Sequence, residues 1–146
     1  MSWQPRNSIV VPIDFSESAA DAIRTANELA DDPSHVHLVH VLVPLDAVSP
    51  GVAFGQTSDE TREKHVRTYA KEFFATAGIE ETPFDVRFGH PGDEIIEYAD
   101  SKQADLIVIP SHGFHGLKRF VLGSVAEQVI RHANCAVLVL RRRDAD

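Results

Sequence analysis

Apolar residues along this chain follow two alternating periods, one typical of strands and one typical of helices. Short apolar runs with the length and composition of buried strands cover residues 8–13, 35–43, 84–88, 106–109 and 136–140. Stretches with the helical period follow Ser16, cover residues 59–77, follow residues 89–92 and cover residues 125–133. Strands that alternate with helices predict a parallel sheet with helices on both faces. We therefore expect a single α/β domain over residues 1–146, built on an open five-stranded parallel sheet.

The segment at residues 110–124 is the most informative part of the chain. It follows the fourth expected strand, carries Gly113 and Gly123, and leads directly into the last expected helix. Such a loop commonly holds phosphate, because its glycines let the backbone approach and the first N–H groups of the helix face the anion. Lys118 and Arg119 add positive charge within the loop. The spacing matches neither the nucleoside-triphosphatase P-loop nor the dinucleotide fingerprint.

Two candidate features of the site, Asp14 and the pair Ser124 and Glu127, have more than one interpretation. Ser124 and Glu127 have the spacing of a helix capping box, and capping alone would account for both. Asp14 ends the first expected strand, where it could contact a ribose or an adenine amine, act as a nucleophile, or cap the next helix. In parallel sheets, ligands bind where the strand order reverses. The order 3-2-1-4-5 would bring Asp14 and residues 110–124 together, whereas 2-1-3-4-5 would favour residues 89–92.

Composition and charge narrow the classes of function. The chain has 146 residues and a net charge of −8, which argues against a general nucleic-acid binder. Its start lacks the apolar core of a signal peptide, and no apolar run approaches the length of a membrane span. Cys135 is the single cysteine, so an internal disulfide is excluded. We expect a cytoplasmic protein with no nucleic-acid or membrane partner.

The sequence offers no convincing catalytic or metal-binding set. His112 and His115 lie in a loop without a neighbouring cysteine or acidic third ligand. The histidines at positions 35, 37 and 40 alternate with apolar residues, which predicts one more polar face of the second strand. We therefore expect no catalytic residue and no metal site, and a regulatory output in place of a catalytic one.

Motifs spread over the whole chain resemble those of the universal stress protein family. In order, they are Val-Val-Pro-Ile-Asp-Phe-Ser at 10–16, His-Val at 40–41, Gly-x-Pro at 89–91, Ser-His-Gly at 111–113, Leu-Gly-Ser-Val-Ala-Glu at 122–127 and Ala-Val-Leu-Val at 136–139. The resemblance implies the strand order 3-2-1-4-5 and frequent homodimers through the last strand, here residues 136–140. Many members of this family bind ATP, and others bind a different nucleotide or none.

The resemblance also implies a nucleotide site. Asp14 matches the family's acid for ribose or adenine, Pro12 and Val41 match apolar positions of its adenine pocket, and Ile109 would line the same pocket. The residues expected at the phosphates are Gly113, Gly123, Ser124 and the N–H of Val125. The expected cofactor is therefore ATP, ADP or AMP, with or without Mg²⁺.

Pro110 is the departure from the family's ATP-binding motif, Gly-x-x-Gly-x9-Gly-Ser/Thr. It replaces the first glycine, removes one N–H group and adds a ring where the nucleotide would approach the backbone. Two alternatives to a nucleotide-binding regulator therefore stay open. One is an interaction protein that binds no nucleotide and works through its dimer and unidentified regulatory partners. The other is a slow ATPase or phosphotransferase in which Asp14 or a loop histidine acts.

Overall fold

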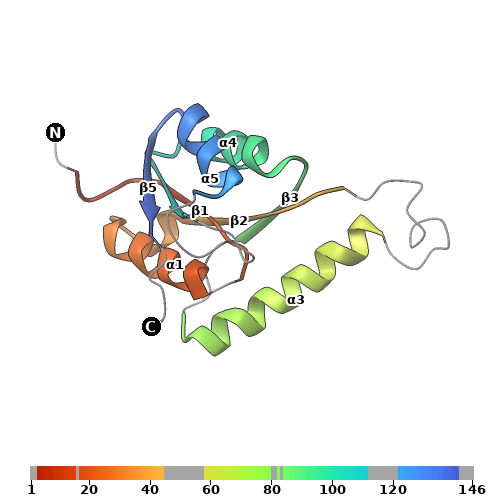
Figure 1. The fold of residues 1–146 in the computed structure, drawn as a ribbon. Helices are drawn as coiled ribbons and strands as arrows, with labels where there is room; N and C mark the ends of the chain where they lie inside the picture. The colour runs from red at the N-terminus through yellow and green to blue at the C-terminus, as the bar shows by residue number, and fades with distance from the viewer. Residues whose placement is uncertain are drawn as a thin grey trace.

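The chain folds around one five-stranded parallel sheet with the strand order β3-β2-β1-β4-β5 (Figure 1). The structure is a computed structural model that describes residues 3–15, 17–44, 58–79, 82, 84–111 and 122–141. The strands are β1 (Ile9–Pro12), β2 (Val36–Leu42), β3 (Phe84–Phe88), β4 (Leu106–Pro110) and β5 (Ala136–Leu140). The helices are α1 (Glu17–Leu29), α3 (Asp59–Ala77), α4 (Pro91–Ser101) and α5 (Ser124–His132), with a short 3-10 helix, η1, at Pro33–His35. The expected fold class and strand order are confirmed.

Each face of the sheet is covered by two helices and carries its own apolar core. On one face, Ile9 and Val11 of β1 pack with α1 and α3, whose contributions include Ile23 and Phe74. The other face is covered by α4 and α5 (Figure 1), and Val10 packs there with residues of both helices. Successive side chains of a strand point to opposite faces, so a sheet covered on both faces needs unbroken apolar strands. This is why β1 and β4, at the centre, are the runs Ile-Val-Val-Pro and Leu-Ile-Val-Ile-Pro.

The ends of α3 match the sequence expectation. Ser58 is the N-cap residue, and its side chain accepts a hydrogen bond from the N–H of Thr61 at 3.1 Å. Gly78 follows the last turn in the left-handed conformation, with φ of 67°, as expected of a glycine that ends a helix. The first two strands are shorter at each end than the apolar runs suggested, because His35 belongs to η1 and Ile13 lies beyond the last paired residue of β1.

The start of α5 differs from the sequence expectation. The helix begins at Ser124, with Gly123 in extended conformation as its N-cap residue, so Ser124 is the first helical residue and not the cap. The predicted capping box of Ser124 and Glu127 is therefore wrong by one position: Glu127 donates its backbone N–H to the carbonyl of Gly123. Ser16, the expected start of the first helix, lies outside the described residues.

Candidate functional site

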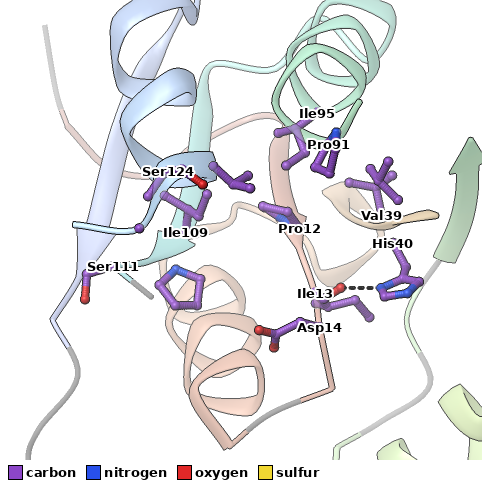
Figure 2. A pocket seen from close by; sticks show the side chains of 15 residues that line it. Pro12, Ile13, Asp14, Val39, His40, Pro91, Ile95, Ile109, Ser111 and Ser124 are labelled. Atoms are coloured by element: carbon purple, nitrogen blue, oxygen red, sulfur yellow. Dashed lines mark hydrogen bonds between the residues drawn. The ribbon is translucent and has the colours of Figure 1, made fainter. Parts of the chain in front are cut away.

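A pocket of about 420 Å³ opens beyond the carboxyl ends of the central strands. The sheet order reverses between β1 and β4, which are direct neighbours. The first turns of α4 and α5 close the pocket on one face of the sheet (Figure 2). The pocket is thus at the place where open parallel sheets bind their ligands.

All but one of the site residues expected from the sequence line this pocket. They are Pro12, Asp14, Val41, Ile109, Pro110, Gly123, Ser124 and Val125. The exception, Gly113, lies outside the described residues, as do the loop residues Lys118 and Arg119 and the two histidines at 112 and 115. The fold therefore brings together residues that are up to 113 positions apart, from Pro12 to Val125.

One part of the pocket is an apolar slot. Side chains of Pro12 and Ile109 lie near Pro91 and Ile95 from the start of α4 (Figure 2). Val41 lines the same pocket and packs against the core cluster that contains Ile95 and Ile109. The sequence pattern placed residues 89–92 at the site only under the alternative strand order 2-1-3-4-5, and it predicted no site residue in α4 under the order found here. The proline directly behind a glycine-containing turn was the available signal, because a proline is favoured in the first turn of a helix and this turn faces the ligand side of the sheet.

The polar end of the pocket is formed by the start of α5. Ser124 and Val125 are its first two residues, and the first N–H groups of a helix have no partner within the helix. The N–H of Gly123, by contrast, is donated to the carbonyl of Ser111 at 2.7 Å. Ser111 in turn donates its own N–H to Leu140 of β5 at 2.9 Å. These two bonds hold the start of α5 against the end of β4.

The backbone of Val41 presents a donor and an acceptor to the pocket. The pairing of β1 with β2 ends where Pro12 lies opposite Val39, and Ile13 donates its N–H to the Val39 carbonyl at 2.9 Å. Backbone groups of a strand alternate in direction, so those of Val41 point to the same side as those of Val39. Within the described part of the chain, no backbone hydrogen bond joins the Val41 N–H to the Ile13 carbonyl. At Val41, the edge of β2 therefore faces the cavity and is not paired with β1.

The histidines of this region do not form the single polar face that the sequence suggested. His37 and His40 differ by an odd number of positions, so their side chains lie on opposite faces of β2. Burial, followed by the charge of Lys102, lowers the pKa of His37. His40 lines the pocket, and its Nδ1 donates to the carbonyl of Ile13 at 2.6 Å (Figure 2). His35 lies in η1, where the hydrogen bond that its Nδ1 donates to the Asp31 carboxylate raises its pKa.

Candidate metal ligands do not gather anywhere among the described residues. No group of three or more His, Cys, Asp or Glu side chains that could hold a metal ion is found among them. Cys135 is half-buried outside the pocket, and burial raises the pKa of its thiol. The described helices also include none with the length and apolar character needed to span a membrane. The pocket combines an apolar slot, an open strand edge, the Asp14 carboxylate and a helix start.

An open parallel sheet with helices on both faces and a pocket at the reversal of strand order defines a doubly wound α/β protein. Residues 5–141 match the model of the universal stress protein family, and the chain belongs to this family. A similar relative is universal stress protein MJ0531 of Methanocaldococcus jannaschii, with 36% identity over an alignment of 143 residues. The match covers 92% of this chain and 81% of the relative.

Solved structures give the same result. The structure of protein MJ0577 of Methanocaldococcus jannaschii is similar, with a TM-score of 0.72 and 27% identity, over 95% of this chain and 98% of the other. The universal stress protein of Archaeoglobus fulgidus in complex with dAMP is similar with a TM-score of 0.58 and 31% identity. That match covers 93% of this chain and 98% of the other.

Proposed function

We propose that this protein binds an adenine nucleotide in the pocket between β1 and β4 and acts as a regulatory stress-response protein. The observation that carries the proposal is the convergence of the open Val41 edge, the Asp14 carboxylate and the start of α5 on one cavity. A volume of about 420 Å³ is also within the ~300–1,000 Å³ common for small-molecule sites. The similar Archaeoglobus fulgidus protein, solved in complex with dAMP, supports an adenine nucleotide as the ligand.

Each part of the nucleotide has a matching part of the pocket. The Watson–Crick edge of adenine offers one acceptor, N1, beside one donor, the 6-amino group. The N–H and carbonyl of Val41 are the complementary pair. The apolar slot around Pro12 and Ile109 accepts the two faces of the base. Asp14 is the acceptor for ribose hydroxyl groups, and its carboxylate points toward the β4 side of the crevice (Figure 2).

The phosphates belong at the start of α5. The first N–H groups of the helix, the partial positive charge of its N-terminus and the Ser124 hydroxyl all favour an anion there. Gly123 has no side chain, so the phosphates can approach its backbone closely. Its own N–H is donated to the carbonyl of Ser111 and is not counted among the donors to the phosphates. Because the described residues hold no acidic cluster, a Mg²⁺ ion would be held mainly by the phosphates of ADP or ATP.

The proposed assembly is a homodimer through β5 in the cytoplasm. β5 is an edge strand whose five side chains are each only partly buried, and such a strand can pair with its copy across a twofold axis. Val139→Lys should therefore shift the sedimentation of the protein toward the monomer. A wild-type chain that sediments as a monomer at high micromolar concentration would exclude this dimer.

Pro110 favours a second candidate, a member of the family that binds no nucleotide and acts through its dimer and protein partners. Its ring lines the pocket, where it takes space beside the ribose and phosphates and replaces an N–H donor. Under this candidate, wild type shows no binding and Pro110→Gly restores it. Under the main proposal, wild type binds AMP and Pro110→Gly binds more tightly.

Calorimetric titration with AMP, ADP and Mg-ATP tests the proposal. Asp14→Asn should weaken binding about ten-fold, the equivalent of one charge-assisted hydrogen bond. Asp21→Asn is the matched control, because Asp21 lies on the exposed side of α1 and pairs there with Arg24. Mass spectrometry of the molecules released from denatured protein provides an independent measurement. An absence of binding by every nucleotide, with none released, would reject nucleotide binding, and turnover of labelled ATP would instead support an ATPase.

A further inference from the structure

The side chain of His40 occupies the hydrogen-bonding position that the next residue of its own strand would take. In a parallel ladder that continued past Pro12, the carbonyl of Ile13 would accept the N–H of Val41. The Ile13 carbonyl instead accepts from Nδ1 of His40 at 2.6 Å (Figure 2). A carbonyl can only accept, so Nδ1 carries the proton in this contact. The last step of the β1–β2 ladder is thus made by a side chain.

The imidazole of His40 also packs against a cluster of aromatic side chains centred on Phe15. The ring of Phe15 lies 4.9 Å from that of His40, between centroids. Phe15 has a positive φ of 65°, which is unusual for a bulky residue and accompanies a bend in the chain directly after Asp14. Phe73 of α3 and Phe84 of β3 support the Phe15 ring at 5.5 and 6.1 Å. The surrounding packing therefore fixes both the histidine and the turn.

We propose that His40 is the positioning residue that keeps the Val41 backbone available to the base. By satisfying the Ile13 carbonyl, it ends the β1–β2 ladder one residue early and leaves the Val41 N–H facing the cavity. This role belongs to the proposed nucleotide site, and the affinity measurements below rest on nucleotide binding there. The residue acts through Val41 and has no need to touch the ligand.

Removal of the His40 donor has a defined structural consequence. The Ile13 carbonyl is left without its partner, and a carbonyl in a partly buried position strongly favours a new donor. The Val41 N–H is the donor that the register of the parallel ladder supplies. Once it pairs with Ile13, it can no longer bind the acceptor of adenine. The base then loses one hydrogen bond although no residue in contact with it has changed.

A set of substitutions separates the hydrogen bond from the ring packing. His40→Asn keeps a donor the same number of bonds from Cα as Nδ1 but removes the ring. His40→Phe keeps a ring but removes the donor, and His40→Leu removes both. His37→Phe, on the opposite face of β2, is the control. We expect the affinity for AMP to fall about ten-fold in the Phe and Leu variants and less than three-fold in His40→Asn and the control.

Amide hydrogen exchange of Val41 without ligand is the second measurement. In wild type and His40→Asn, the Val41 amide should exchange much faster than that of Val39, which lies within the β1–β2 ladder. In the Phe and Leu variants it should become protected. Val41 protection already present in wild type, or full affinity in His40→Phe with loss in His40→Asn, would overturn the proposal. If wild type binds no AMP, the proposed nucleotide function fails, while the exchange data still decide whether His40 holds the strand edge open.

Discussion

Alanine at Ser58 should lower the stability of the protein and leave nucleotide binding unchanged. Alanine at Ser124 should weaken nucleotide binding and leave the stability nearly unchanged. Ser58 caps α3 and accepts the N–H of Thr61 at 3.1 Å, so Ser58→Ala leaves that group without a protein partner. The expected loss in the free energy of unfolding is about 1 kcal/mol. Ser124 follows the N-cap residue Gly123, and alanine in the first turn removes no capping bond. Ser124→Ala should change the free energy of unfolding by less than about 0.5 kcal/mol.

Calorimetric and urea-induced unfolding of the two variants measure this difference. For 146 residues, an unfolding entropy of about 2.1 cal/mol/K per residue sums to about 0.3 kcal/mol/K, so 1 kcal/mol lowers Tm by about 3 °C. Ser58→Ala should therefore melt about 3 °C below wild type, and Ser124→Ala within about 1–2 °C of it. Binding should show the reverse, with AMP affinity about ten-fold weaker only in Ser124→Ala. Equal destabilisation by both substitutions would show that Ser124 caps α5 and would refute the assigned helix start.

Three further predictions follow from local geometry. Gly78→Ala should lower the free energy of unfolding by about 1 kcal/mol in urea, because alanine is strained at φ of 67° although the site has open space for its methyl group. An unchanged free energy of unfolding would contradict the left-handed conformation at the end of α3. Burial and the hydrogen bond to Asp85 raise the pKa of Tyr98, so absorbance at 295 nm should show a late tyrosinate step that Tyr98→Phe removes. Tyr98 accordingly stabilises the fold below pH ~10, and this contribution is lost as pH rises further. Cys135, with its pKa raised by burial, should react with Ellman's reagent much more slowly in the folded than in the urea-unfolded protein.

The sequence predicts the elements of this fold more completely than the details of the site. Unbroken apolar runs such as that of β4 identify buried parallel strands, since both faces of such strands must be covered. The order of the strands, by contrast, came from the family resemblance, because alternation of strands and helices permits several orders. The start of α5 was placed one residue off since Gly123 and Ser124 are both acceptable N-cap residues.

The role of His40 could not be read from the sequence for a different reason. A histidine in an apolar strand has the same pattern whether it is solvated, buried or hydrogen-bonded to a distant carbonyl. Its contact joins two residues 27 positions apart and depends on where β1 stops relative to β2. That relation is set by the turn at Phe15 and its aromatic packing, which local periodicity does not contain.

Binding of an adenine nucleotide in the pocket between β1 and β4 can be measured residue by residue when AMP is titrated into ¹⁵N-labelled protein. We predict saturable amide shifts concentrated at Asp14, Val41, Ser124 and Val125, with the amides of α3 and of the outer edge of β5 nearly unchanged. Shifts that do not saturate, or a saturable set that leaves Val41 and Val125 unmoved, would contradict this prediction.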